Sequence, residues 1–263
     1  MARILALIVW GFSLAACSPG SAPAQIHWIG PADSLTGPLT FIVSDPSGPP
    51  DSQIELRLAE LDTPLPGLTE AALERLLDGQ EVGCQPGSEV EDRYGRRIVH
   101  VYLRPTGRQG PAEPVWLQAE LVRAGAARVL SHADNRQDTA ALLALEAEAR
   151  SAQAGLWDEP GQAVRDTHPD ALAQDIGSVQ LVEGRVVEAT RLRSGRVYLN
   201  FGADYRTDFT VMISAEDEPV FLAAGLDPVA LESYRIRVRG WVEDENGPMI
   251  RIDHPERIEI LED

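Results

Sequence analysis

The chain of 263 residues is long enough for one large domain or two modest ones, each with its own hydrophobic core. Its formal net charge is −18, and its 23 basic residues are all arginine because the sequence contains no lysine. A protein this acidic repels polyanions at long range, which excludes nucleic-acid binding through overall charge. Any recognition of phosphate must therefore come from a local cluster of arginines.

The first residues resemble a bacterial lipoprotein signal. Arg3 precedes an apolar run over residues 4–14, which is too short to span a bilayer stably. The run ends in LAAC at residues 14–17, which is similar to a lipobox and implies cleavage before Cys17 and lipidation of that residue. The alternative is simple cleavage with loss of Cys17. We expect a signal peptide over residues 1–16, a flexible tether over 17–35, and a periplasmic protein anchored in the outer membrane.

The hydrophobic pattern that follows predicts strands interspersed with helices, a mainly β, α+β fold. Thr69 is expected to cap the first helix, and Gly125 to end the second. The expected strands lie at residues 39–43, 54–61, 80–85, 97–103 and 126–130, and the expected helices at 69–77, 115–124 and 139–153. These elements predict a first domain over residues 36–157.

Residues 158–176 contain proline, glycine and charges without periodicity, which is typical of a linker. Short strands and turns dominate after it. Strands are expected at residues 179–187, 197–201, 209–213, 234–242, 249–252 and 256–261. Several short strands in so short a stretch favour a second, smaller β-barrel over residues 177–263.

Two short motifs combine arginine with acidic and aromatic residues. Arg57 opens the stretch RLAELDTP at residues 57–64, and Arg96 closes the stretch DRYGR at residues 92–96. A planar, permanently charged guanidinium group can bind two phosphate oxygens at once. Hydrolysis of a phosphodiester also uses a carboxylate to activate water, and a hard cation such as calcium can assist.

In this order the motifs resemble the phosphodiester-binding frame of the staphylococcal nuclease (thermonuclease) family. The resemblance covers residues 39–157 and includes LVRAGAARV at 121–129 and the GLW at 155–157 that follows the last helix. It implies a nuclease-type oligonucleotide/oligosaccharide-binding (OB) barrel with helices. A nuclease of this family would act on DNA or RNA.

The same resemblance implies roles for individual residues. Arg57 and Arg96 match the arginines that bind the scissile phosphate and stabilise the transition state. Tyr94 matches an aromatic residue of the nucleotide pocket. Asp62 matches a carboxylate ligand of a Ca²⁺ ion, and Thr63 matches a ligand that acts through its backbone carbonyl.

Three departures from the family pattern argue against catalytic activity, and the first two indicate a degenerate metal site. Leu65 stands where the family has its catalytic glutamate, directly after the Asp-Thr-Pro sequence. The segment TGPLT at residues 36–40 has no carboxylate where the family carries Asp-Gly-Asp-Thr. The tyrosines that stack on the base are replaced by Leu130, Ser131 and Ala133. A calcium ion held only by Asp62, one carbonyl and water would be bound weakly.

Structural roles remain open for the same side chains. Arg57 and Arg96 could pair with Asp62, Glu60 or Asp92 across neighbouring strands. Asp62 could instead cap a turn at the following proline.

Other reactive residues have structural alternatives too. Glu60 or Glu70 could supply a displaced carboxylate. We interpret His100 as a core or edge residue and His132 as loop surface. Cys84 is expected to be a small buried apolar group.

The C-terminal segment resembles a second OB barrel through GRVYLNFG at residues 195–202 and RIRVRGWV at 235–242. The alternating arginines of the second stretch share one strand face, and arginine beside aromatic residues is typical of single-strand binding. The alternative is that these arginines pair with carboxylates while Trp241 and Tyr198 fill the core. The residues concerned are Arg235, Arg237, Arg239, Tyr198, Phe201, Tyr205 and Trp241.

These observations leave three hypotheses. The first is a nuclease-derived envelope protein with a degenerate metal site, which binds nucleic acid or acts as an interaction module without a cofactor. The second is an active Ca²⁺-dependent nuclease on extracellular DNA or RNA. The third is a structural envelope lipoprotein with a protein partner.

Overall fold

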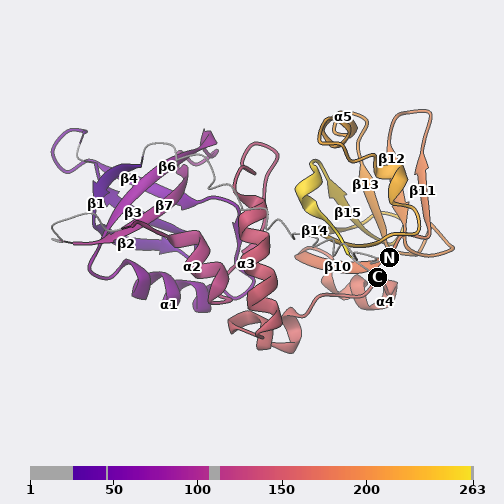
Figure 1. Ribbon diagram of the computed structural model, residues 1–263, viewed down its shortest axis with the longest axis horizontal. Helices are drawn as coiled ribbons and strands as arrows, with labels where there is room; N and C mark the ends of the chain where they lie inside the picture. Colours follow the sequence, from indigo (N-terminus) through magenta and orange to yellow (C-terminus); the bar gives the residue numbers. More distant parts are fainter. Residues whose placement is uncertain (1–25, 46, 107–112, 262–263) are drawn as a thin grey trace, which may run out of the picture.

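The computed structural model describes residues 26–45, 47–106 and 113–261, without the side chains of residues 86–90. The signal sequence and Cys17 lie outside the described residues. The expected α+β class is confirmed, because two seven-stranded sheets are accompanied by few helices (Figure 1). Within the described residues, no helix has the length and apolarity needed to cross a bilayer.

The first sheet is antiparallel except for the pairing of β4 with β7, which is parallel. Its strands, in spatial order, are β1 (His27–Gly30), β6 (Gln80–Glu91), β7 (Arg97–Pro105), β4 (Gln53–Leu58), β3 (Thr40–Ser44) and β2 (Ala32–Gly37), and β8 (Val115–Trp116) pairs with β7. In β4 the buried residues Leu56 and Leu58 alternate with Arg57, whose side chain therefore lies on the opposite face of the strand. This alternation brings Arg57 to the surface.

Two sequence expectations for this part need correction. The tether expected over residues 17–35 is shorter, because β1 and β2 already pair with β6 and β3 from His27 onward. The helix expected from residue 115 begins at Leu117 instead. Residues 115–116 form the short strand β8, in which Trp116 pairs with Tyr102 of β7. In both places a neighbouring strand edge supplies backbone partners that the local pattern does not reveal.

Three helices cover this sheet: α1 (Pro66–Leu77), α2 (Leu117–Arg123) and α3 (Thr139–Ser151). Thr69 does not cap α1, which begins three residues earlier at Pro66, a residue suited to the first helical turn. The Thr69 side chain is buried instead, and its hydroxyl donates to the Ala126 carbonyl at 2.6 Å. The hydroxyl thus ties α1 to the turn after α2.

Gly125 ends α2 as expected, with a left-handed φ of 60°. A Cβ at this position would lie 1.9 Å from the Ala154 carbonyl oxygen. The Gly125 carbonyl also accepts a hydrogen bond from Leu156 at 2.8 Å. The two glycines at 125 and 155 therefore let the chain after α2 lie directly against the chain after α3.

The second sheet begins after a linker that is itself folded. The linker region contains the short helices η1 (Gly155–Asp158), η2 (Pro160–Gln162), α4 (Pro169–Leu172) and η3 (Ala173–Asp175). The sheet has the spatial order β10 (Val179–Arg185), β14 (Arg235–Asp244), β15 (Pro248–Ile252), β13 (Thr210–Ile213), β12 (Val197–Asn200) and β11 (Glu188–Arg191), and β16 (Ile258–Ile260) pairs with β14. Its remaining helices are α5 (Glu218–Ala223), η4 (Pro228–Leu231) and η5 (Pro255–Arg257). Strand β11 is an addition to the sequence prediction.

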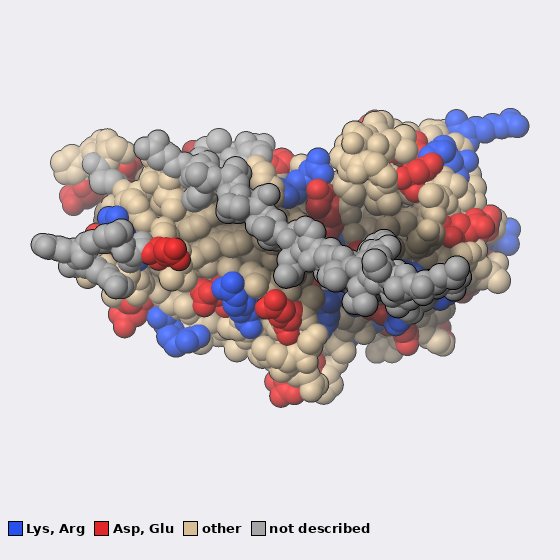
Figure 2. Space-filling view, in the orientation of Figure 1, with Lys and Arg blue, Asp and Glu red and all other residues tan. Residues whose placement is uncertain are grey.

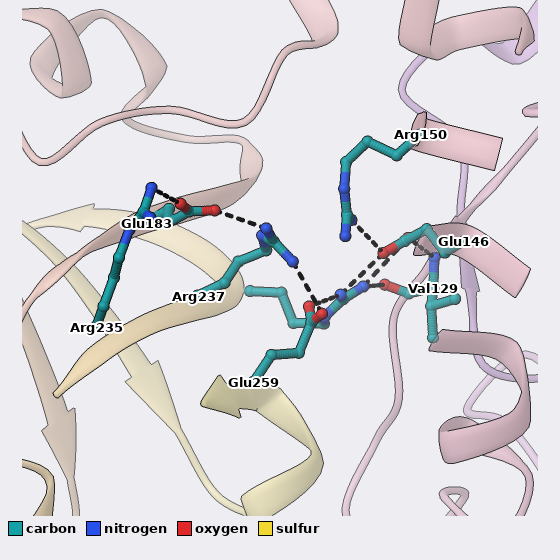
Figure 3. Close-up of polar contacts among 8 residues, drawn as sticks. Val129, Glu146, Arg150, Glu183, Arg235, Arg237 and Glu259 are labelled. Carbon is teal, nitrogen blue, oxygen red and sulfur yellow. Dashed lines mark hydrogen bonds and ion pairs between the residues drawn. The ribbon is translucent and has the colours of Figure 1, made fainter. Parts of the chain in front are cut away.

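Helix α3 lies between the two sheets (Figure 1), and buried charges join them there. The guanidinium group of Arg239 on β14 is fully buried and donates to both oxygens of Glu146 on α3, at 2.9 and 3.2 Å. It also donates to the Val129 carbonyl at 2.8 Å and to Glu259 on β16 at 2.5 Å. In Figure 3 the carboxylates of Glu146 and Glu259 point toward one another, and dashed lines mark these contacts.

An apolar cluster and further polar contacts extend this interface. Leu156 and Trp157 pack with Leu181 of β10, and Leu65 packs against this group. The hydroxyl of Ser131 lies 2.7 Å from Nε2 of the buried His254, which follows β15. Residues of both sheets thus meet in one packed interface.

Candidate functional site

The two predicted catalytic arginines converge on one carboxylate. Arg96 donates through Nε to Asp92 at 2.8 Å, and its Nη2 lies 2.7 Å from the same oxygen. Arg57 Nη1 is 3.7 Å from that oxygen, which is an ion pair without a direct hydrogen bond. The Arg57 side chain is 36% exposed. The structure therefore places Arg57 and Arg96 side by side and leaves Arg57 donors accessible.

Asp92 organises the turn that carries Arg96. Its Oδ1 accepts hydrogen bonds from the backbone of Tyr94 at 2.9 Å and of Arg96 at 3.1 Å. Partial burial by itself raises the pKa of Asp92, but the hydrogen bonds from Arg96 and Tyr94 outweigh it and lower the pKa. Asp92 is therefore ionised at neutral pH and competes with any anion for the two guanidinium groups.

Tyr94 lies at the tip of this turn and is 66% exposed. The guanidinium groups of Arg93 and Arg96 lie 4.8 and 4.9 Å from the centre of its ring. These cation–π contacts keep the ring beside the arginines. Its exposure is compatible with a stacking surface for a base, and that role stays a prediction.

A cleft of about 440 Å³ opens beside Arg57. Its walls come from the end of β4, from the Asp92 turn and from the segment after β9 (Arg128–Val129). Arg57 and Arg93 line it together with Glu91, Asp92 and Asp134. Because positive and negative groups are mixed, the cleft offers a local anion site at Arg57 rather than a broad basic surface.

His132 also lines this cleft, where the sequence predicts only a loop surface residue. Partial desolvation of its ring, with the positive charges of Arg257 and Arg57 nearby, lowers its pKa. His132 is therefore neutral at neutral pH and can accept or donate a hydrogen bond to a ligand. Its position in the cleft could not be read from the sequence, because it depends on how the segment after β9 folds back.

The predicted metal ligands lie elsewhere, at the interface of the two sheets. Asp62 belongs to the two-residue strand β5 (Leu61–Asp62), and its Oδ2 accepts hydrogen bonds from Arg128 at 2.9 and 3.3 Å. The same guanidinium group donates to the Val179 carbonyl of β10 at 2.9 Å. Thr63 follows, half-buried, in the connection to α1. Arg128 thus takes the place at Asp62 that a cation would need.

The donor set around Asp62 does not fit a calcium ion, which takes about six to eight oxygen ligands. Among the described residues, no group of three or more His, Cys, Asp and Glu side chains is arranged to hold a metal ion. Leu65, at the position of the family's glutamate, packs against the apolar interface cluster instead. The metal assignment of Asp62 and Thr63 stays a prediction without support from this geometry.

Glu60 is the other acidic residue of the first motif, and it is fully buried. Its backbone adopts a left-handed φ of 63°. Its carboxylate accepts hydrogen bonds from the Thr139 hydroxyl at 2.7 Å and from the Asp138 backbone at 3.3 Å. His100 Nε2 lies 3.5 Å from Glu60, in the core as expected. Glu60 therefore holds the start of α3 and is not exposed to act as a displaced base.

The alternating arginines of β14 are paired with carboxylates, as in the structural alternative. Arg237 lies between Glu183 at 2.6 Å and Glu259 at 3.0 Å, and Arg235 pairs with Glu183 at 2.5 Å (Figure 3). Of the aromatic residues, Phe201 is buried in the core, whereas Tyr205 and Trp241 are exposed. This strand face therefore has few arginine donors left for a nucleic acid.

Cys84 is buried in the first core, and burial raises the pKa of its thiol to about 12. Only the thiolate is strongly nucleophilic, so Cys84 serves as a small apolar group.

Comparison with known proteins supports the resemblance in one segment. Residues 68–159 match the family model described as staphylococcal nuclease homologue. The match includes Tyr94 and Arg96 and begins after the motif that contains Arg57 and Asp62. No curated protein matches the chain at a significant level.

Proposed function

With residues 68–159 staphylococcal nuclease-like, we propose that the protein is a nuclease-derived binding module of the cell envelope. It holds a phosphodiester of a nucleic acid at Arg57 and Arg96 without cleaving it. The observation that carries this proposal is the accessible Arg57, 3.7 Å from Asp92 and beside Arg96, with Asp62 occupied by Arg128.

Binding requires a ligand that competes with Asp92. Arg96 makes short contacts to Asp92, whereas Arg57 makes one long ion pair. A phosphate that enters the cleft can therefore take the Arg57 donors while Arg96 stays in place. The exposed Tyr94 ring beside them can stack on a base, which adds about 1–3 kcal/mol in single-strand binders.

Hydrolysis lacks a positioned carboxylate in this proposal. Asp92 is bound to two arginines, Glu60 is buried at the start of α3, and Leu65 packs in the interface cluster. Because the residues around Asp62 do not fit calcium either, water near the phosphate has no activating group from the family's set. Binding without turnover follows.

The proposal includes a cellular location, the periplasmic face of the outer membrane. A lipid on Cys17 would attach the chain to the periplasmic side of the outer membrane, with the folded part beginning near His27. Metabolic labelling with a palmitate analogue tests this anchor. Loss of the label in Cys17→Ser supports it, and an unlabelled wild-type chain contradicts it.

The binding experiment uses the full mature chain and a fluorescein-labelled single-stranded DNA oligonucleotide. Anisotropy titrations at about 50 and 200 mM salt should show weaker binding at high salt. We expect Arg57→Ala to weaken binding about tenfold, since a hydrogen bond to a charged group contributes about 1.5–3 kcal/mol. Arg123→Ala, an exposed arginine on α2 paired with Glu120, is the matched control.

Cleavage of the same oligonucleotide is measured with added Ca²⁺. We expect intact oligonucleotide after long incubation. Cleavage products that depend on Arg57 and Arg96 would establish the active nuclease instead. If the wild type, Arg57→Ala and Arg123→Ala all fail to bind the oligonucleotide, the structural lipoprotein is the remaining hypothesis.

A further inference from the structure

A second pocket, of about 460 Å³, lies on the second sheet, on the face away from its core. Strands β11, β12, β13 and β15 turn Ala189, Leu199, Val211 and Ile250 into the core. The alternate residues of the same strands face the pocket. This pocket belongs to a different sheet from the arginine cleft.

The floor of the pocket is one row of directly opposed residues. Glu188 pairs with Asn200, Asn200 with Thr210, and Thr210 with Met249, across four neighbouring strands. The next row places Thr190 opposite Tyr198. Strand register therefore fixes polar groups side by side on the floor, and all of these residues line the pocket.

Asn200 provides the observation that points to a ligand. Its side chain is 8% exposed, and its Oδ1 accepts a hydrogen bond from the Thr210 hydroxyl at 3.3 Å. In the part of the chain that the structure describes, no acceptor pairs with its Nδ2 group. This amide group is not among the atoms that are buried without a partner, so its donor is open to the pocket, where an acceptor of a ligand can reach it.

Glu188, directly across the strand from Asn200, offers the complementary group. Its carboxylate accepts a hydrogen bond from the Thr190 hydroxyl at 2.9 Å and keeps further acceptor capacity. A free donor and a free acceptor thus stand next to each other. A hydroxyl group is matched to such a pair because it donates to the carboxylate and accepts from the amide.

The charges of the pocket select against anions. Glu188 and Glu245 line it, and no arginine is among its described lining residues. Arg251 lies on β15, two residues after Met249, and its guanidinium group is paired with Glu243 and Glu245. An organic cation would satisfy the carboxylates but would leave the Asn200 donor without an acceptor. A neutral ligand with several hydroxyl groups satisfies both.

Aromatic and apolar walls complete the site. Tyr198 lies on the floor, the exposed Tyr205 stands at the edge, and Leu192 and Met249 add apolar contacts. The C–H face of a sugar ring packs against such tyrosine rings, with its hydroxyl groups directed at the polar row. The volume lies within the range of about 300–1,000 Å³ that is usual for ligand pockets. We propose that this pocket binds a neutral carbohydrate.

The test uses the full mature chain on an array of neutral mono- and oligosaccharides, followed by calorimetric titration of the strongest binder. Asn200→Asp keeps the shape but replaces the donor by an acceptor, and it should weaken binding at least tenfold. Tyr205→Ala should weaken binding several-fold. Tyr234→Ala, an exposed tyrosine that does not line the pocket, should leave it unchanged. Thermal melts of each variant establish that it is folded.

Heparin fragments and spermidine serve as the charged probes, and neither should compete with the sugar. The proposal is overturned if no neutral carbohydrate binds, or if Asn200→Asp binds it as well as the wild type. Competition by spermidine that is lost in Glu188→Gln overturns it as well, because the site would then be one for cations.

Discussion

The arginines beside the first cleft and those at the interface differ in how many carboxylates surround them. Arg57 and Arg96 share the single carboxylate of Asp92. Arg239 is fully buried between Glu146 and Glu259, and it also binds a backbone carbonyl. The first pair keeps donors for a ligand, whereas Arg239 has become part of the fold. The number and burial of the partners, rather than the residue type, decides which arginines can bind phosphate.

The surface of the molecule supports this reading. Acidic and basic side chains are interspersed on the face shown in Figure 2. The described residues on this face therefore present no extended basic track to a charged ligand. The proposed recognition of phosphate would therefore depend on individual guanidinium groups whose internal ion pair is long, as at Arg57.

The largest expected effect comes from breaking the buried network. Arg239→Ala leaves Glu146, which is fully buried, with a hydrogen bond from the Val129 backbone at 2.8 Å and the longer ion pair to Arg150 at 3.4 Å. We expect a loss of about 3–5 kcal/mol in the free energy of unfolding, because an uncompensated buried charge is strongly destabilising. Urea denaturation measures this loss.

Arg251→Ala is the matched control, because Arg251 is an exposed arginine on the neighbouring strand that pairs with Glu243 and Glu245. Its loss should cost about 1 kcal/mol or less. Similar losses in both variants would show that burial does not distinguish the two arginines.

A smaller effect is expected from restoring the family's glutamate. Leu65→Glu places a carboxylate against the apolar interface cluster of Leu156, Trp157 and Leu181. We expect a destabilisation of about 1–3 kcal/mol and no Ca²⁺-dependent cleavage, because Arg128 already occupies Asp62. Denaturation and a cleavage assay measure the two parts, and Leu65→Met controls for side-chain size. Cleavage by the variant would show that only the glutamate is missing.

Removing the charge of Asp92 tests whether this carboxylate competes with a ligand for Arg57 and Arg96. Asp92→Asn removes the charge that faces Arg57 and Arg96 while it keeps the hydrogen-bonded turn. We expect oligonucleotide affinity to rise by about tenfold or less, in keeping with the modest energy of a partly exposed ion pair. Anisotropy titration measures the change. Unchanged affinity would mean that Asp92 does not compete with the ligand.

The smallest effect concerns the pH dependence of the interface. Burial alone raises the pKa of Glu259, but the charges of Arg239 and Arg237 outweigh it and hold the pKa below the ordinary value of 4.5. As the pH falls, Glu259 is therefore protonated in the unfolded chain at a higher pH than in the folded chain. Its contribution to the free energy of unfolding is fully present above about pH 4.5 and is lost as the pH falls through the lowered pKa.

Denaturation at a series of acidic pH values measures this loss. Glu259→Gln should show a shallower decline in stability below pH 4.5 than the wild type does. Parallel declines would exclude Glu259 as a source of the acid sensitivity.

Much of the fold could be predicted because local patterns suffice for it. The alternation in β4 and β7, the helix-favouring run of α3 and the glycine after α2 each follow from short stretches of sequence. The proximity of Arg57 and Arg96 could be predicted from the family resemblance, because it implies that both arginines bind one phosphate. The strands β1, β2 and β11 were missed. Strand β1 depends on the edge of the distant strand β6, whereas β2 and β11 pair with the next strand in the chain but have short, mostly polar sequences without an apolar alternation.

The sequence by itself determined the α+β class and the nuclease-like segment, and it predicts that Leu65 stands in place of the family's glutamate. Only the tertiary structure decided which charged side chains are buried, paired or accessible. It buried Glu60 and Arg239, paired Asp62 with Arg128, and left Arg57 accessible. The reason is physical: propensity and motif act over a few residues, whereas the state of a charged side chain depends on whichever groups the folded chain brings within a few ångströms of it.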